Sequence, residues 1–332
     1  MAGVAKEAGV SIVTVSRVIN DHEYVAEDTK ARVLEIIDRL GYQPNAIARS
    51  LVSKESKTIG LITADLSDYF FSLALSGAEV EARNQDYFCL LGSTEGDLEN
   101  EPDYVRLFRE RYVDGLFFVR PSTDIYDERL LKLLDNDLPI VTIGYHLPVD
   151  NLIVVDVDNE DGGRQATQHL IDLGHRRIAM VTGPEGYKSV GDRNKGYAQV
   201  LETAGIPYNH DLVVETEWSY EGGYGAAQTL LARDVEFSAI FAHSDEIAIG
   251  VMQALRGAGL SIPDDISVVG YNDNPVTAYL NPPLTTVKQP MRRLGVLGMK
   301  LLLRAIKGET IEKCEHLVGV ELIERNSTKP YS

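Results

Sequence analysis

The chain has 332 residues, of which 44% are hydrophobic and 25% charged, and this composition is typical of a globular protein with two or three domains. It contains no apolar run of about 18 residues and no basic-then-apolar leader, so we expect no membrane span and no secretion, and a cytoplasmic location. Cys89 and Cys314 lie far apart in sequence and lack metal-ligand spacing, which fits a reducing compartment and predicts no metal site.

The net charge of −18 comes from the C-terminal part of the chain. Residues 1–57 hold eight basic and eight acidic residues, whereas residues 58–332 hold 24 basic and 42 acidic ones. Phosphates would repel so acidic a body. If the protein binds nucleic acid, we therefore expect it to do so through residues 1–57.

Residues 1–43 have the pattern of a small helical domain. The first helix carries small apolar side chains on one face, and Gly9 can adopt the positive φ that ends a helix. The hydroxyl of Ser11 can bond a free N–H in the first turn of a second helix, so this residue is a suitable N-cap. The three helices are expected over residues 4–8, 11–19 and 26–40.

The second helix has an inner and an outer face. Val15, Val18 and Ile19 follow the i, i+3, i+4 rule and should face the core. The outward side chains are expected to be Val13, Thr14, Arg17 and Asn20, with Ser16 at the edge. A glycine turn followed by a helix with outward Arg and hydroxyl groups predicts a recognition helix for the major groove. The alternative is a three-helix domain with no role in DNA binding.

The third helix and the segment after it differ in expected stability. Val33, Ile37 and Leu40 should line the inner side of the third helix. Pro44 cannot continue that helix but suits the first turn of another. The next helix could have only two turns and would be marginal alone in water. Residues 44–57 are therefore predicted to be a hinge, ordered in one state and disordered in another.

From residue 58 onward, short apolar runs alternate with amphipathic helices, which indicates parallel βαβ units and an α/β fold. The alternation occurs twice, so we expect two lobes with a ligand cleft between them. The expected strands cover residues 59–62, 87–91, 115–119, 139–143, 154–157, 178–182, 212–215, 239–242, 266–270 and 284–287. The expected helices cover residues 70–84, 99–111, 126–135, 161–173, 191–204, 220–232, 245–257 and 291–306.

Four polar or aromatic side chains of the second half indicate a polar small-molecule ligand. Asp245 and Asn272 follow predicted strands and should lie at their carboxyl ends, where such sheets bind ligands. Trp218 follows another strand, and Arg193 lies near the start of a helix. Carboxylate, amide and guanidinium groups can bond hydroxyls, and an indole face can stack on a sugar ring. The alternatives are that Asp245 only caps its helix and that Trp218 belongs to the core.

The N-terminal motifs resemble those of the LacI/GalR family of bacterial transcription regulators. They are VAKEAGVS at residues 4–11, TVSRVIN at 14–20 and GYQPNAIARSL at 41–51. The body resembles the periplasmic sugar-binding fold carried by that family, with LGHRRI at 173–178, VVGYND at 268–273 and PPLTTVKQP at 282–290. The resemblance implies chain crossings between the lobes near Val157, Val287 and Val318. It divides the chain into a helix-turn-helix domain, 1–43, a hinge helix and linker, 44–57, and an effector-binding and dimerisation domain, 58–332, with lobes of about 58–157 plus 288–318 and about 158–287 plus 319–332.

The resemblance also implies which residues contact DNA. Ile12 and Val13 fall where the family sets operator choice, and both could contact thymine methyl groups. Leu51 matches the hinge leucine that enters the minor groove and kinks the duplex. Core packing is the alternative for Ile12, and an ordinary linker role is the alternative for Leu51. The predicted DNA-binding residues are Ser11, Ile12, Val13, Thr14, Ser16, Arg17, Asn20, Asn45, Ala48 and Leu51.

The predicted effector-binding residues are Tyr69, Phe70 and Phe71 on the first-lobe wall, and Arg193, Trp218, Asp245 and Asn272 in the second lobe. Three departures from the family pattern stand out. Asn272 replaces the commoner Asp, and Gly144-Tyr145 stands where Asp-Arg or Gly-Arg is common, so the effector is expected to differ. The first and third helices lack the usual side-chain caps, because Met1-Ala2-Gly3 and Ala26 stand at those positions.

We therefore expect a homodimeric transcription regulator of the repressor type. It would bind a pseudo-palindromic double-stranded DNA operator and respond to a small-molecule effector, a sugar, without any cofactor. Alternatives are the same fold answering to a purine or a phosphorylated carrier protein, or a transport-type solute-binding protein. An enzyme is the least supported class, since no nucleophile elbow, metal pair or P-loop is present and no catalytic residue is predicted.

Overall fold

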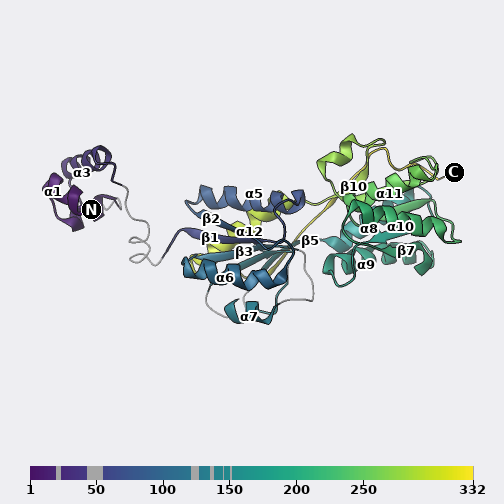
Figure 1. Ribbon diagram of the computed structural model, residues 1–332, viewed down its shortest axis with the longest axis horizontal. Helices are drawn as coiled ribbons and strands as arrows, with labels where there is room; N and C mark the ends of the chain where they lie inside the picture. The colour runs from purple at the N-terminus through teal and green to yellow at the C-terminus, as the bar shows by residue number, and fades with distance from the viewer. Residues whose placement is uncertain are drawn as a thin grey trace. The chain divides into compact units, whose positions relative to one another are not determined.

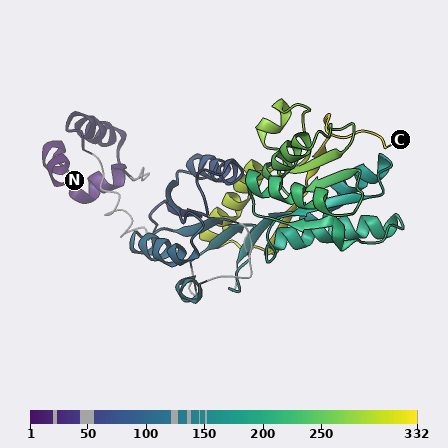
Figure 2. The ribbon, with the colours of Figure 1, turned by 45° about the vertical axis from the view of Figure 1, so that its right-hand side comes forward.

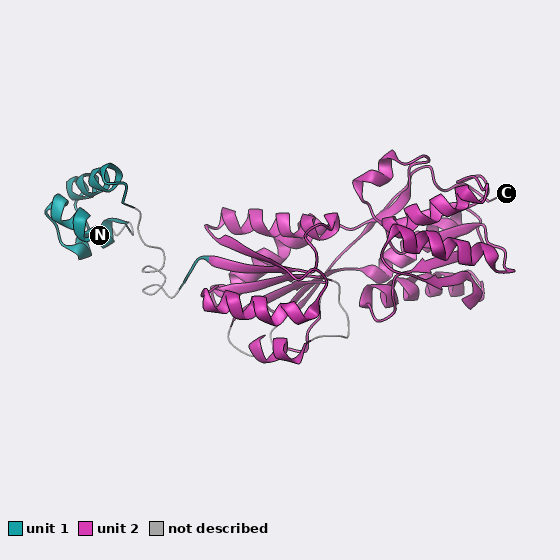
Figure 3. Ribbon diagram, in the orientation of Figure 1, with its two compact units in different colours: residues 1–57 teal, residues 58–332 magenta. Residues whose placement is uncertain are grey.

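The computed structural model describes residues 1–19, 24–42, 55–120, 127–134, 138–144, 146–149 and 152–331 (Figure 1). The chain forms two compact units, residues 1–57 and 58–332 (Figure 3). In the described ranges no helix has both the length and the apolar character needed to cross a membrane.

The first unit is built from three helices whose ends follow the local sequence signals. They are α1 (Ala2–Ala8), α2 (Ile12–Ile19) and α3 (Glu27–Arg39). Gly9 ends α1 at φ 66° and its N–H donates to the Ala5 carbonyl. Ser11 caps α2, because its Oγ accepts the N–H of Thr14 at 3.0 Å. As expected, neither α1 nor α3 has a side-chain cap.

The core of this unit is made by one face of each helix. It contains Val4, Ala5, Ala8, Val15, Val18, Val33 and Ile36. One expectation for the helical domain was wrong, and the core-packing alternative for Ile12 is excluded. Leu40 is 47% exposed because α3 ends at Arg39, and Ile36 takes the inner position instead. Ile12 is 51% exposed, so it does not pack in the core but begins α2 on its outer face.

The first lobe of the second unit is a six-stranded parallel sheet in the order β11-β5-β4-β3-β1-β2. Its strands are β1 (Thr58–Thr63), β2 (Phe88–Ser93), β3 (Gly115–Val119), β4 (Ile140–Ile143), β5 (Ile153–Val157) and β11 (Glu315–Val318). Its helices are α5 (Tyr69–Asn84), α6 (Glu101–Glu110), α7 (Glu128–Leu134) and α12 (Met291–Ile306). Helices α5 and α12 cover one face, and α6 and α7 cover the other (Figure 1).

Helices α5 and α12 approach so closely that glycine is required at the contact. A Cβ on Gly295 would lie 1.9 Å from the Ala74 carbonyl oxygen, and one on Gly77 would lie 2.2 Å from the Arg292 carbonyl oxygen. Neither backbone can yield without moving its helix. The two glycines therefore set the spacing between α5 and α12. Tyr69 is the first residue of α5, and α12 follows the crossing from the second lobe.

The second lobe repeats the α/β architecture of a sheet covered by helices (Figure 2). Its strand order is β12-β10-β9-β8-β6-β7. Its strands are β6 (Ile178–Thr182), β7 (Val213–Glu215), β8 (Ala239–Ala242), β9 (Ser267–Asn272), β10 (Thr285–Lys288) and β12 (Glu321–Ile323), the last antiparallel to β10. Its helices are α8 (Asn159–Asp172), α9 (Lys188–Thr203), α10 (Tyr220–Ala232) and α11 (Asp245–Gly257). Short 3₁₀ turns, η1 (Leu98–Asn100), η2 (His210–Leu212) and η3 (Pro275–Tyr279), complete the body.

The chain passes between the two lobes three times. The passages follow β5, β10 and β11, since each of these strands is succeeded by an element of the other lobe. Strands β11 and β12 were not anticipated from the sequence. They are short and partly exposed, so they lack the apolar runs that identified the other strands.

Candidate functional site

The outer face of α2 combines apolar side chains with one guanidinium group. Ile12 and Val13 are 51% and 60% exposed, and Arg17 is also exposed. Ser11 and Thr14 are tied to each other by a 2.9 Å hydroxyl contact that closes the first turn. Ser16 is half-buried. Such a face can contact thymine methyl groups and hydrogen-bond a guanine or a phosphate.

Four residues predicted to contact DNA, Asn20, Asn45, Ala48 and Leu51, lie outside the described residues. The described part of the helical domain therefore contributes Ser11, Ile12, Val13, Thr14, Ser16 and Arg17 to this surface. These six belong to α2 or to its N-cap.

A cavity of about 480 Å³ lies in the second unit and is lined by both lobes. Most of its walls are formed where parallel strands end, because the carboxyl ends of neighbouring strands meet at one edge of a sheet. Arg120 follows β3, Asp156 and Val157 end β5, and Asn272 ends β9. Six of the seven predicted effector residues line it, namely Tyr69, Phe70, Phe71, Arg193, Trp218 and Asn272. The size is within the range of small-molecule sites.

Trp218 belongs both to the cavity and to the edge of the second-lobe core. It is half-buried, packs against the buried cluster between α10, α11 and the sheet, and meets the ring of Tyr187 edge-on at 6.0 Å. Gly183 makes room for the indole, since a Cβ at that position would lie 2.1 Å from the ring. The two interpretations of Trp218, core residue and ligand contact, are thus compatible.

Arg193 lines the cavity and is held by contacts with three residues of the second lobe. It is 5% exposed, its Nε donates to Asn159 Oδ1 at 3.0 Å, and one terminal nitrogen donates to the His243 carbonyl at 2.5 Å. The guanidinium lies 3.7 Å from the centroid of the Tyr271 ring. Burial lowers the pKa of Arg193 from its ordinary value, yet a guanidinium still remains charged.

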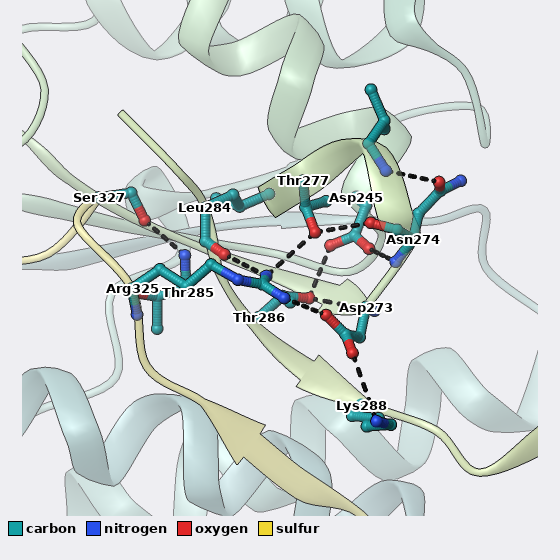
Figure 4. Close-up of polar contacts among 11 residues, drawn as sticks. Asp245, Asp273, Asn274, Thr277, Leu284, Thr285, Thr286, Lys288, Arg325 and Ser327 are labelled. Atoms are coloured by element: carbon teal, nitrogen blue, oxygen red, sulfur yellow. Dashed lines mark hydrogen bonds and ion pairs between the residues drawn. The ribbon is translucent and has the colours of Figure 1, made fainter. Parts of the chain in front are cut away.

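Asp245 does not line the cavity, contrary to the sequence expectation. Its side chain is fully buried, and its carboxylate accepts the Asn274 N–H and the Thr286 hydroxyl, both at 2.6 Å (Figure 4). Burial raises the pKa of this carboxyl to about 8. The helix-capping alternative is also wrong, because Ser244 caps α11 through a bond from the Ile247 N–H. Asp245 instead joins α11 to the loop after β9 and to β10.

The loop after β9 is braced from the C-terminal segment. Arg325 pairs with Asp273 at 2.5 Å and also donates to the Leu284 carbonyl at 2.7 Å (Figure 4). Asn272 and Asp273 both have positive φ, 118° and 57°, a conformation that needs such support. The amide oxygen of Asn272 accepts a bond from Gln289 at 2.7 Å, which leaves its amide nitrogen to meet a ligand.

Sequence reasoning missed several polar residues of the cavity. They are Asp65, Arg120, Asp156, Tyr220, Glu246 and Asn274. The strand-end rule that selected Asn272 also applies to Arg120 and Asp156 and could have found them. Arg120 forms a buried pair with Glu101 at 2.5 Å, and burial raises the pKa of Asp156. For Glu246 the sequence offered no signal that separated it from its neighbour Asp245.

Two family profiles match the chain. Residues 1–45 match that of the bacterial regulatory proteins of the lacI family, and residues 167–328 match a periplasmic binding protein-like domain. The chain belongs to the LacI family. Its relatives are transcription regulators, not enzymes. The protein is therefore a DNA-binding transcription regulator whose body is a two-lobed effector-binding domain, as the resemblance in its motifs implied.

Relatives with similar sequences cover nearly the whole chain. The transcriptional regulator RegA of Clostridium saccharobutylicum is 37% identical over 98% of both chains. The transcriptional repressor PurR of Photobacterium profundum is 37% identical over 98% of this chain and 97% of its own. Among solved structures, a lac repressor dimer bound to operator and the anti-inducer ONPF has 29% identity and a TM-score of 0.87, and a CelR–cellobiose complex has 32% and 0.75. Each covers 98% of both chains.

Proposed function

We propose that this regulator is a homodimeric repressor that binds a pseudo-palindromic operator through α2 of each protomer and responds to a sugar in the cavity between its lobes. The observation that carries the proposal is the composition of that cavity. Carboxylates and amides from both lobes line it together with the half-buried Trp218. The carboxylate and amide oxygens can accept hydrogen bonds from the hydroxyl groups of a sugar ring, while the indole stacks on the apolar face of that ring.

The contacts made by both lobes suggest how a ligand would act. Phe70 and Asp68 come from the first lobe, and Trp218 and Glu246 come from the second. A ligand that bonds both walls favours the closed arrangement, because only that arrangement lets it make all of its contacts. Moving the lobes from mostly open to mostly closed takes about 5.5 kcal/mol of differential binding. Closure would change how the first lobes of the dimer present residues 44–57 to DNA.

An exposed apolar edge strand supports the dimer. Strand β2 ends the first sheet, and Phe88, Leu90 and Leu91 on it are 78%, 38% and 49% exposed. Apolar side chains on an unpaired edge strand invite association with another chain. A second copy of this chain, related by a twofold axis, would cover the edge and bring two helical domains to one operator. The lac repressor relative is described as a dimer on its operator.

A purine effector is the second candidate. Relatives 34–37% identical over nearly their whole length are named transcriptional repressor PurR, whereas other relatives were solved with cellobiose or ribose. The cavity is also lined by aromatic rings, among them Phe70, Phe71, Trp218 and Tyr220, which could clamp a flat nucleobase. The carboxylates favour the sugar, because a purine offers fewer donors to acceptor-only groups.

A ligand screen on the full chain separates these candidates. Trp218, the single tryptophan, reports from the cavity wall while the melting temperature reports binding anywhere. A ligand at 100 times its dissociation constant should add about 2.7 kcal/mol of stability. A mono- or disaccharide that raises the melting temperature, changes Trp218 emission and alters operator affinity is the expected result. A nucleobase that does so while sugars do not would overturn the sugar assignment.

A further inference from the structure

The described lining of the cavity carries more acidic than basic side chains. We propose that the cavity selects an effector without any anionic group, and that Asp68 and Glu246, one on each lobe, impose this selection. The inference rests on the proposed function only in taking the cavity as the effector site. It excludes phosphorylated sugars, nucleotides and acidic sugars, and it admits neutral or amine-bearing ligands.

Carboxylates outnumber guanidinium groups in the described lining by four to two. Asp65, Asp68 and Asp156 come from the first lobe, and Glu246 comes from the second. They are acceptor-only groups when ionised, so they bond donors such as hydroxyl or ammonium and repel another anion. Repulsion is stronger here than in bulk water because the cavity is partly enclosed by protein.

The described cationic residues of the lining already have protein partners. Arg120 is paired with the buried carboxylate of Glu101. Arg193 donates to the amide oxygen of Asn159 and the carbonyl of His243, and its flat face is covered by Tyr271. These bonds, made at 2.5 to 3.0 Å, hold both guanidinium groups in place, and Glu101 balances the charge of Arg120. Because the charge of Arg120 is already compensated, the four carboxylates are the larger charge of the described lining.

Two of the helix N-termini at the cavity, those of α5 and α11, are occupied by side-chain caps. The N-terminus of a helix is a common anion site because its first N–H groups are free. In α5, the Asp68 carboxylate accepts the Phe70 N–H at 2.7 Å. In α11, the Ser244 hydroxyl accepts the Ile247 N–H at 3.1 Å. Asp68 thus fills one anion site with a fixed negative charge.

Asp68 and Glu246 act on each other from opposite walls. Burial raises the pKa of Asp68, and the charges of Glu246 and Asp65 raise it further. Closure of the two lobes brings like charges together, which opposes closure unless a donor-rich ligand lies between them. A neutral polyol satisfies both carboxylates, an amine does so more strongly, and an anion adds a third negative charge.

Trp218 allows a test that does not require the natural effector. The quenching constants of caesium, iodide and neutral acrylamide are measured for the fluorescence of the full-length protein. Each quenching constant is divided by the one for free N-acetyltryptophanamide. We expect caesium to be favoured over iodide by roughly threefold at low ionic strength, with the preference fading as salt screens the cavity. The double variant Asp68→Asn, Glu246→Gln should lose most of the preference.

A matched control separates the cavity field from the net charge of the protein. Glu236 is an exposed carboxylate of the second lobe, 80% exposed and paired with Arg177 outside the cavity. Glu236→Gln should leave the quenching ratio unchanged. The proposal would be overturned if the quenching ratio changed equally in the control and the double variant, or if it changed in neither. Asn can cap α5 as Asp does, and Asp68→Asn alone replaces the double variant if the latter does not fold.

A second test of the proposal compares matched ligands that differ in charge. Glucosamine, glucose and glucose 6-phosphate, and the same series for any sugar found in the screen, are compared by melting temperature and Trp218 emission. The expected order of affinity is amine, then neutral, then phosphate, with the phosphate at least about tenfold weaker than its neutral parent. A phosphate that binds more tightly than the parent would overturn the proposal. A caesium preference without any sugar binding would support the exclusion of anionic effectors but contradict the proposal that the effector is a sugar.

Discussion

The Asp245 carboxylate accepts the Thr286 hydroxyl at 2.6 Å, which ties the first turn of α11 to β10. The same carboxylate accepts the backbone N–H of Asn274, a residue of the cavity wall. Strand β10 leads directly to the crossing into the first lobe. One buried carboxyl therefore connects the ligand-facing loop of the second lobe with a strand that leads to the first.

This carboxyl should make stability depend on pH. Its folded pKa of about 8 lies above the unfolded value of about 3.9, so the unfolded chain loses its proton first. The contribution of Asp245 to the free energy of unfolding should therefore fall as pH rises from about 4 to about 8. Asp245→Asn mimics the neutral form and should flatten that part of the profile, as measured by urea unfolding. A profile unchanged by Asp245→Asn, with the exposed Asp264→Asn as the control, would contradict the burial argument.

The space beside Trp218 predicts a sharp effect of one methyl group. Gly183→Ala places a Cβ 2.1 Å from the indole ring, so the ring must move, at a cost of about 1–3 kcal/mol. We expect shifted Trp218 emission and ligand affinity lowered at least about tenfold. Gly191→Ala in α9 has open space around it and should be neutral or slightly stabilising. Titration of both variants by fluorescence checks the prediction, and equal affinities would refute it.

Arg17 should account for much of the base recognition by α2. Arg17→Ala should weaken operator binding by about 1–3 kcal/mol, measured by fluorescence anisotropy on a duplex selected from a random pool. Ligand binding in the second unit should be unaffected. Arg39 offers the control, because its pair with Glu7 is exposed on both sides and such pairs contribute about 0–1 kcal/mol. If Arg39→Ala weakens binding as much as Arg17→Ala does, α2 is not the principal DNA-contacting surface.

The edge strand β2 should control dimer formation. Phe88→Asp puts a charge on the most exposed apolar side chain of that strand, and a charged edge disfavours pairing. Analytical ultracentrifugation should show monomers, and operator affinity should fall with them. Leu317, 53% exposed on β11 at the opposite edge of the same sheet, provides the control. A monomer from Leu317→Asp and a dimer from Phe88→Asp would move the interface to the other edge.

Local signals in the sequence determined the helices, most strands and the fold class. Gly9 and Ser11 mark the turn between α1 and α2 because positive φ and side-chain capping are properties of single residues. The alternation of apolar runs with amphipathic helices predicted two α/β lobes, and helices α10, α11 and α12 have the expected bounds. Strands β11 and β12 escaped because short, partly exposed strands carry little hydrophobic periodicity.

The cavity could be predicted only in part, because side-chain direction depends on the tertiary structure. Position at the end of a strand was enough to bring Trp218 and Asn272 to the cavity wall. The same criterion wrongly predicted that Asp245 lines the cavity. Its side chain is buried in the protein, whereas the neighbouring Ser244 and Glu246 line the cavity. Asp68 and Glu246 line the cavity from different lobes and are 178 positions apart in the chain. Charge acts through space and not along the sequence, so only the packing of the two lobes decided which carboxylates would share one cavity.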